Sequence, residues 1–243
     1  MTSDAERVLW VTGAGSGMGQ AAAVAAAGRG WKVALSGRRA DRLQQTAQRV
    51  DDAGGASLVL PMDIRDLPAI HDGHASIQQR WGRVTDLVLS AGHNMPTRYW
   101  RDQSMDEFGQ VVATNLTGVA AMVDAVLPDL RDSVGGHVVA VSSYAAWRFS
   151  PHSGVAYAAS KTALVALCAA LNEQEAPHGV RACHLCPGEV DSEFLALRPQ
   201  VPDQEARAVM LTPDDVARAV LFVLESPPHV RIDELVISPV AQH

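Results

Sequence analysis

The sequence predicts an α/β fold, a doubly wound parallel sheet of about seven strands with helices on both faces. Short β-branched runs alternate with longer helical patterns along all 243 residues, which is the element order of doubly wound sheets. Several strand candidates, such as Leu87–Leu89 and Val138–Val141, are apolar without alternation, as expected of strands buried on both faces. No repeat or linker marks a boundary, so we expect one domain over residues 1–243.

The elements are expected in regular order. The strands are predicted at Val8–Thr12, Lys32–Ser36, Ser57–Met62, Asp86–Ser90, Gly136–Ser142, Val180–Cys186 and Asp233–Ile237. The helical patterns between and after them cover residues 18–29, 40–52, 66–81, 104–131, 154–176 and 213–225. Right-handed crossovers would then bring the functional loops together at the carboxyl ends of the strands.

Composition excludes several classes of protein. Apolar residues make up 47 % of the chain and charged residues 19 %, as in folded globular proteins. The net charge is −7 without any run of Lys or Arg, so neither nucleic acid nor a membrane is expected as a partner. We recognise no secretory signal, and the small-residue run Ala21–Ala27 is too short to span a bilayer. Three cysteines make no disulfide framework, and we expect a cytoplasmic location.

A glycine-rich segment follows the first strand. It reads Thr12-Gly13-Ala14-Gly15-Ser16-Gly17-Met18-Gly19, so the spacing is Gly13-x-x-x-Gly17-x-Gly19 rather than G-x-G-x-x-G. Glycines let the backbone turn tightly and approach a pyrophosphate, which then lies at the positive N-terminus of the next helix. A plain strand–helix turn would not need four glycines, and we expect a Rossmann-type dinucleotide site.

The end of the second strand bears on the choice of cofactor. An NAD site usually places a carboxylate about 20 residues past the glycine loop, where it accepts hydrogen bonds from the ribose. Here the segment reads Ser36-Gly37-Arg38-Arg39, and the guanidinium groups could bind a 2′-phosphate that a carboxylate would repel. We expect NADP(H) rather than NAD(H), with two solvated arginines at the start of a helix as the alternative.

Four polar residues form a candidate catalytic group. Tyr157 and Lys161 lie four residues apart in a predicted helix and share one face. The cation would favour the phenolate, whose ordinary pKa is about 10, and bring Tyr157 into the range of a general acid or base. Ser143 ends a buried strand, where its hydroxyl could hold a carbonyl oxygen beside the phenol. Asn115 is an amide in an apolar helix, which also fits a helix kink or a satisfied core amide.

Taken together, these features resemble the classical short-chain dehydrogenase/reductase family over nearly the whole chain. The matching segments are Thr12–Gly19, Met62-Asp63-Ile64, Ser90-Ala91-Gly92, Asn115, Ser143, Tyr157 with Lys161, and Pro187-Gly188-Glu189-Val190-Asp191-Ser192. The resemblance implies that Tyr157 donates or accepts the proton and that Ser143 orients the substrate oxygen. It further implies that Lys161 binds the nicotinamide ribose and lowers the pKa of Tyr157, and that Asn115 holds a water molecule in a relay to Lys161.

The resemblance also implies contacts to the cofactor, with Asp63 at the adenine and Pro187, Val190 and Ser192 at the carboxamide. The residues expected at the cofactor are Thr12, Gly13, Ser16, Gly17, Met18, Gly19, Arg38, Arg39, Asp63, Ile64, Ser90, Ala91, Gly92, Tyr157, Lys161, Pro187, Gly188, Val190 and Ser192. Ser90 stands where the family has an asparagine, and the interval from Ser143 to Tyr157 is about one residue longer than usual, with Ser142 as the less favoured serine.

One subgroup of the family is similar in two further segments. Leu211-Thr212-Pro213-Asp214-Asp215-Val216 and Asp233–Val240 replace the common Asp-Gly-Gly ending. They resemble NADP-dependent 3-hydroxy acid (serine-type) dehydrogenases and the related sulfoacetaldehyde reductases. The resemblance implies a small anionic hydroxy or oxo substrate, such as a 3-hydroxy acid or a sulfonate or phosphonate aldehyde.

Substrate contacts are expected in the loops that follow the strand ends near Tyr157. The candidates are Ser143, His93, Arg148 and Phe194, with a lid near residues 189–210. We hypothesise that Arg148, flanked by Trp147 and Phe149, binds the anionic group of the substrate. The alternative is an arginine that points outward with its stem over these aromatic side chains.

The predicted activity is NADP(H)-dependent hydride transfer to or from a carbonyl or alcohol carbon. Two alternatives stay open. Trp100, Trp147 and Phe149 could line a pocket for a larger neutral ketone such as a polyketide, sugar or steroid. A non-catalytic NADP(H) redox sensor could use the same fold, although it would not need an acid/base pair.

Two other features concern metals and assembly. Cys183-His184-Leu185-Cys186 places its cysteines on opposite faces of a strand, which is poor for shared ligation, and we expect no metal. The helices over residues 104–131 and 154–176 carry more apolar surface than one sheet face needs. This excess, together with the family resemblance, predicts a homotetramer, or a homodimer, built on these helices.

Overall fold

A computed structural model describes residues 6–133 and 135–242 and confirms the predicted α/β fold. Seven parallel strands form one sheet in the order β3-β2-β1-β4-β5-β6-β7. The strands are β1 (Val8–Thr12), β2 (Lys32–Gly37), β3 (Ala56–Pro61), β4 (Asp86–Leu89), β5 (His137–Val141), β6 (Arg181–Pro187) and β7 (Glu234–Ile237). Their bounds lie within a residue or two of the expected ones.

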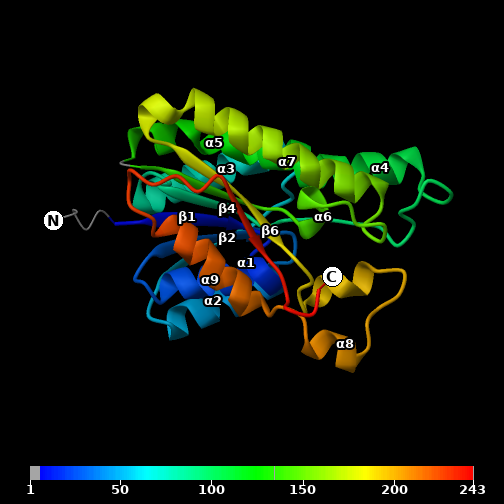
Figure 1. Ribbon diagram of the computed structural model, residues 1–243. Helices are drawn as coiled ribbons and strands as arrows, with labels where there is room; N and C mark the ends of the chain where they lie inside the picture. Colours follow the sequence, from blue (N-terminus) through cyan, green and yellow to red (C-terminus); the bar gives the residue numbers. More distant parts are fainter. Residues whose placement is uncertain (1–5, 134, 243) are drawn as a thin grey trace.

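Helices cover both faces of this sheet. The longer ones are α1 (Gly17–Ala27), α2 (Ala40–Asp52), α3 (Leu67–Trp81), α4 (Met105–Val112), α5 (Gly118–Asp132), α7 (Val155–Gln174) and α9 (Pro213–Leu224). The shorter ones are α6 (Tyr144–Trp147), α8 (Gln204–Ala208) and the 3₁₀ helices Ala176–His178 and Glu193–Leu197. Figure 1 shows α3, α5 and α7 on one face and α1, α2 and α9 on the other.

The sheet therefore separates two hydrophobic cores. Successive residues of a strand point to opposite faces: in β1, Trp10 belongs to the core under α3, α5 and α7, whereas Leu9 and Val11 belong to the core over α1, α2 and α9. All five residues of β1 and of β5 are buried. Burial on both faces is why these strands lack polar alternation in the sequence.

The strand order reverses between β1 and β4, and this places the functional loops. β1 pairs with β2 on one side and with β4 on the other. In this register Thr12, the last residue of β1, lies opposite both Ser36 and Leu89. The chain segments that follow β1, β2 and β4 consequently leave the sheet side by side, which is the crevice where ligands of such sheets bind.

The helix expected over residues 104–131 is interrupted, and that prediction is wrong in its middle. A capping box between Ser104 and Glu107 starts α4, and a π-helical turn over Ala113–Thr117 separates it from α5. Asn115 lies in this turn and is fully buried. A π-helical turn inserts an extra residue into the helix and is frequent at functional sites, and here it holds the Asn115 amide in the interior.

The segment predicted as a lid, residues 189–210, contains the 3₁₀ helix Glu193–Leu197 and α8. A parallel bridge pairs Val190 with Leu211 and fixes both ends of the segment beside the sheet. Figure 1 shows α8 below the carboxyl ends of the strands, away from the main layer of helices. Neither short helix was expected, because each is only five residues long, too short to show a helical period.

Two stretches, Met105–Asp132 and Val155–Gln174, are long and apolar enough to cross a membrane by length and composition alone. Both pack against the sheet: α5 contacts β4 and β5, and α7 contacts β6. Helices that cover a buried sheet have the same composition as membrane helices, so their apolar character alone gives only weak evidence of a membrane span.

Candidate active site

The glycine loop forms a close-packed cradle beside the end of β4. Gly13 has a φ of +67°, and a Cβ there would lie 2.8 Å from the backbone nitrogen of Ala91. Gly19 packs directly behind the loop: a Cβ added at this position would lie 2.5 Å from the carbonyl oxygen of Gly13. The backbone nitrogen of Ala91 donates to Thr12 Oγ1 at 3.1 Å. Any side chain at Gly13 or Gly19 would clash with the backbone of this cradle, so both positions require glycine.

A cleft of about 240 Å³ opens above this cradle. We call it the cofactor cleft. Of the residues expected at a cofactor, it is lined by Thr12, Gly13, Ser16, Gly17, Met18, Arg38, Arg39, Asp63, Ile64, Ser90, Ala91, Gly92, Tyr157, Lys161 and Ser192. Gly19 lies outside this lining, and Pro187, Gly188 and Val190 line the neighbouring pocket instead. His93, expected at the substrate, lines the cofactor cleft.

The residues of this cleft fit a dinucleotide. Helix α1 begins at the cradle; its N-cap residue Ser16 makes no capping hydrogen bond, and its first turn holds no acidic residue. The free N–H groups and the positive end of the helix dipole are therefore available to a pyrophosphate. The carboxylate of Asp63 binds the Arg65 side chain at 2.6 Å, and this contact lowers the pKa of Asp63.

Three arginines stand at the mouth of the cofactor cleft near the end of β2. Arg38 and Arg39 line it, and Arg39 Nη2 donates to Ser16 Oγ at 3.2 Å. Glu193, from the 3₁₀ helix on the opposite wall, lies 3.3 Å from Arg39 Nη2 and 3.6 Å from Arg42 Nη1. These exposed ion pairs bridge the cleft, and such pairs are weak enough to open for a ligand.

The cation of Lys161 is buried beneath the cleft. Lys161 Nζ donates to the backbone oxygen of Val141 at 2.8 Å and lies 5.9 Å from the centre of the Tyr157 ring. Burial lowers the pKa of Lys161 to about 8. The predicted pairing of Tyr157 and Lys161 on one helix face is thus present in α7, which begins at Val155 after Gly154 with a φ of +83°.

Tyr157 is placed to hold a proton at neutral pH. Burial raises its pKa, while the Ser143 hydroxyl and the charges of Arg198 and Arg98 lower it, and the net direction is upward. Ser143 caps the short helix α6 by accepting from Ala145. Ser142 instead donates to the backbone oxygen of Lys161 at 3.2 Å, so Ser143 rather than Ser142 is the serine whose hydroxyl acts on the Tyr157 phenol.

Asn115 braces the end of β4 and does not itself line either pocket. Its Oδ1 accepts from the backbone N–H of His93 at 2.7 Å, and its Nδ2 donates to the backbone oxygen of His93 at 2.9 Å and to Ser160 Oγ at 3.2 Å. The amide thereby fixes the loop that follows Ser90-Ala91-Gly92 against α7. Burial and the charges of Arg38 and Arg65 lower the pKa of His93.

A second pocket of about 580 Å³ adjoins the cofactor cleft. Met18, Ser142, Tyr157, Ser192 and Phe194 line both, and the rings of Phe194 and Tyr157 lie 5.9 Å apart. The second pocket is also lined by Asn94, Arg98, Tyr99, Arg101, Ser143, Ser150, His152, Ser153, Pro187, Gly188, Glu189, Val190, Leu195, Arg198, Pro199 and Gln200. The Tyr157 phenol thus lies where the cofactor cleft and the second pocket meet.

The structure places Arg148 outside both pockets. Arg148 is exposed, lines neither pocket, and stacks on the ring of Trp147, with 4.3 Å between its Cζ and the ring centre. Trp147 and Phe149 are exposed as well. The short helix α6 ends at Trp147 and turns these side chains outward, which is the alternative that the sequence left open.

Comparison with known proteins identifies the family. The family model described as short chain dehydrogenase matches residues 7–201. The chain belongs to this family. An uncharacterised oxidoreductase of Staphylococcus aureus (strain N315) is 30 % identical over 240 residues, which cover 99 % of this chain and 100 % of the relative. The protein is therefore an oxidoreductase of the short-chain dehydrogenase type.

Solved structures agree with this assignment. An alcohol dehydrogenase from the archaeon Thermococcus sibiricus, complexed with 5-hydroxy-NADP, superposes with a TM-score of 0.87 at 30 % identity and covers 98 % of both chains. The closed form of a serine dehydrogenase complexed with NADP⁺ has a TM-score of 0.87 at 30 % identity, covering 97 % of this chain and 96 % of that one. Short-chain dehydrogenases thus share its fold from end to end.

Three pocket residues of this short-chain dehydrogenase were not expected. Arg98, Tyr99 and Arg101 lie between β4 and α4 and line the second pocket. The only signal for them was their position after a strand end, since no periodicity marks which side chains of an irregular loop fold inward. Arg198, which lies in the lid segment, lines the same pocket and pairs with Glu189 at 3.0 Å.

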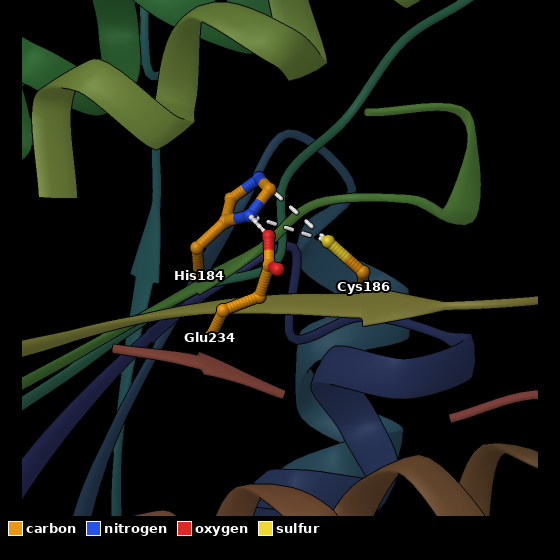
Figure 2. A group of neighbouring side chains, drawn as sticks. All are labelled: His184, Cys186 and Glu234. Carbon is orange, nitrogen blue, oxygen red and sulfur yellow. Dashed lines mark hydrogen bonds and ion pairs between the residues drawn. The ribbon is translucent and has the colours of Figure 1, made fainter. Parts of the chain in front are cut away.

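His184, Cys186 and Glu234 lie together on β6 and β7 (Figure 2). His184 Nδ1 lies 3.1 Å from Glu234 Oε1 and 3.2 Å from Cys186 Sγ. His184 and Cys186 share a face of the strand because they are two residues apart, unlike Cys183 and Cys186, which are three apart. Burial raises the pKa of Cys186 to about 12, which disfavours the thiolate that a metal would bind. The absence of a metal stays a prediction.

Proposed function

We propose that this chain is an NADP(H)-dependent oxidoreductase that interconverts a hydroxyl and a carbonyl group on a small anionic compound. The observation that carries the proposal is the place of Tyr157, which lines both the cofactor cleft and the second pocket. A proton donor at this junction can contact a substrate in the second pocket on the side that a nicotinamide in the cofactor cleft would face. The match to the short-chain dehydrogenase family supports the hydride chemistry.

The chain's own residues supply the proton and the orientation. A nicotinamide supplies or accepts the hydride when bound. For carbonyl reduction, Tyr157 gives its phenolic proton to the carbonyl oxygen, and the Ser143 hydroxyl holds that oxygen beside it. Because the pKa of Tyr157 is raised, the phenol is protonated and ready to donate at neutral pH. Lys161 stabilises the phenolate that remains, and for alcohol oxidation the same proton moves in the opposite direction.

The arginines near β2 support NADP(H) as the cofactor. Arg38 and Arg39 line the cleft where the second strand ends, and no acidic residue follows Gly37 there. Guanidinium groups bind phosphate by paired hydrogen bonds. NADP-type ligands are also bound to the alcohol dehydrogenase and serine dehydrogenase neighbours.

The charge of the second pocket supports an anionic substrate. Arg98, Arg101 and Arg198 line it, against one acidic residue, Glu189. Serine, the compound in the name of one structural neighbour, is a hydroxy compound with a carboxylate. The large-ketone alternative rested on Trp100, Trp147 and Phe149, and none of these three lines either pocket.

Purified protein would be assayed for NADPH oxidation with two short aldehydes of equal size, one with a terminal carboxylate or sulfonate and one with a neutral amide. NADH would be run in parallel. We expect kcat/KM to favour NADPH and the anionic aldehyde. Preference for the neutral aldehyde would overturn the substrate class, and equal or better use of NADH would overturn the cofactor preference. Cofactor binding without turnover over a wider panel of carbonyl compounds would favour the sensor alternative.

A further inference from the structure

We propose that Arg98 is the residue that binds the anionic group of the substrate in the second pocket. This assignment rests on the proposed function and deepens it, because it names the anchor and moves it away from Arg148. Arg98 lies in the loop between β4 and α4, on the wall of the pocket that also holds Tyr157 and Ser143. Four observations carry the assignment.

The first observation is a buried cation without a counter-ion. Arg98 is only 4 % exposed, yet it forms no ion pair with any carboxylate in residues 6–133 and 135–242. Burying an unpaired charge is costly, and proteins normally pair such a group. Burial accordingly lowers the pKa of Arg98. A bound anion would supply the missing charge.

The second observation concerns the free edge of its guanidinium. Nε donates to the backbone oxygen of Met95 at 2.7 Å, and Nη2 donates to the backbone oxygen of Leu197. Nη1 has no hydrogen-bond partner among the described residues, and this nitrogen is not fully buried. Since Arg98 lines the second pocket, the open space beside Nη1 is the pocket, and this nitrogen is left to meet a ligand.

The third observation is that the Arg98 backbone is held rigidly. The backbone N–H of Val155 donates to the Arg98 carbonyl oxygen at 2.9 Å. Gly154 lies so close that a Cβ there would be 2.5 Å from Arg98 Cβ and 2.8 Å from its carbonyl oxygen. Arg98 is therefore fixed against the start of α7, two residues before Tyr157. A preorganised charge loses little entropy when it binds a ligand.

The fourth observation separates Arg98 from the other arginines of the pocket. Arg198 is paired with Glu189 at 3.0 Å, and its side chain is 33 % exposed. Arg101 is 79 % exposed and lies 3.7 Å from Asp102. Both are solvated and already have acidic partners, so their net attraction for an anion is weaker. Arg98 alone among these three combines burial with an unpaired charge.

A purely structural role is the competing explanation, because Arg98 also bonds Leu197 at the edge of the lid segment. The two roles differ in what they do to an uncharged ligand. A guanidinium that only holds the lid would favour charged and neutral ligands alike. A guanidinium that binds the anion would discriminate between them, and a lysine at the same place would restore part of that discrimination.

The test compares 3-hydroxypropanoate with 3-hydroxypropanamide, which are matched in size and differ in charge. Each is titrated by calorimetry into protein saturated with NADPH, so that no turnover occurs. The proteins are wild type, Arg98→Met, Arg98→Lys and, as the matched control, Arg148→Met. The NADPH Kd and Tm of every variant show that the fold and the cofactor cleft are intact.

We expect wild type and Arg148→Met to bind the carboxylate at least about tenfold more tightly than the amide. Arg98→Met should lose that preference, with the Kd of the carboxylate raised about 30-fold or more and that of the amide changed less than about threefold. Arg98→Lys should recover part of the preference. Retained preference in Arg98→Met, or equal weakening of both ligands, would overturn the role of Arg98. No preference in wild type would overturn the anionic substrate class along with it, whereas failure to bind NADPH would overturn the proposed cofactor.

Discussion

Lys161 is a single side chain whose chemistry is set by its burial. Its pKa falls from 10.5 to about 8 in the folded chain because burial disfavours the cation. Between these two pH values the unfolded chain holds a proton on this amine that the folded chain has released. The folded state therefore gains stability as the pH rises through this window, and below about 8 the amine is protonated in both states.

We expect the free energy of unfolding of wild type, relative to Lys161→Met, to increase by up to about 3 kcal/mol as the pH rises from about 8 to about 10.5. Urea unfolding of both proteins across this range, without cofactor, measures the difference and cancels the titration of all other groups. A difference that stays flat or falls with pH would contradict the lowered pKa.

The phenol of Tyr157 is the second residue with a direct prediction. Tyr157→Phe removes the proton donor and keeps the ring that packs near Phe194, so kcat should fall by about 10²–10⁴-fold while the Kd for NADPH stays within about threefold. Stopped-flow kinetics measure kcat, and fluorescence titration measures the Kd for NADPH. Tyr144→Phe is the matched control, since Tyr144 lines neither pocket and its variant should keep its turnover. Full activity in Tyr157→Phe would remove Tyr157 from the mechanism.

The residues of the site could be predicted where backbone pattern fixes them. Tyr157 and Lys161 are four apart on one helix, and the glycine loop joins a strand to a helix, so their places follow from the period of the element. Arg98 and Arg148 lie in irregular loops, where each side chain's direction depends on a turn such as α6 or on a close approach such as that of Gly154. The sequence therefore drew attention to Arg148, which lines neither pocket, and gave no sign of Arg98, which lines the second.

At the scale of elements, the β1–α1 junction makes the sharpest prediction. Gly13→Ala would place a methyl group 2.8 Å from the Ala91 nitrogen at a φ of +67°. The backbone conformation alone costs about 1–2 kcal/mol, and the clash adds to it. We expect a lower free energy of unfolding and weaker NADPH binding, both measured on the purified variant.

Gly109→Ala is the matched control for this prediction. Gly109 lies in α4, where an added Cβ meets nothing within 4 Å. Alanine in a helix is about 0.5–1 kcal/mol better than glycine, so this variant should be as stable as wild type or more so, with unchanged NADPH binding. If Gly13→Ala behaved like Gly109→Ala, the cradle would not be as tight as its contacts indicate.

Elements with a strong period were predicted closely, and those without one were not. Most strands of the sheet are buried apolar runs, and all seven are bounded clearly enough that their limits agree within a residue or two. The π-helical turn at Asn115 follows from tertiary contacts with His93 and Ser160, which no local pattern reports. The short helices of residues 189–210 are five residues long each, too short to show a helical period.

For the whole molecule, the prediction that awaits measurement is its assembly. Helix α7 leaves Val165 41 % exposed beside exposed alanines at 166, 169 and 170, and a smooth small-residue face of this kind suits packing against a second copy. We expect light scattering to give a tetramer, or a dimer, for wild type and a smaller species for Val165→Glu. Val209→Glu, at the end of α8, is exposed and should keep the wild-type mass. A wild-type monomer would contradict this assembly.

The wall shared by the two pockets also has a kinetic consequence. Met18, Ser192 and Phe194 face both spaces, so a dinucleotide in the first completes the boundary of the second. A small molecule that arrives at an empty protein meets a cavity open on that side and leaves again. The two reactants should consequently enter in a fixed sequence, dinucleotide before substrate, and leave in the reverse one.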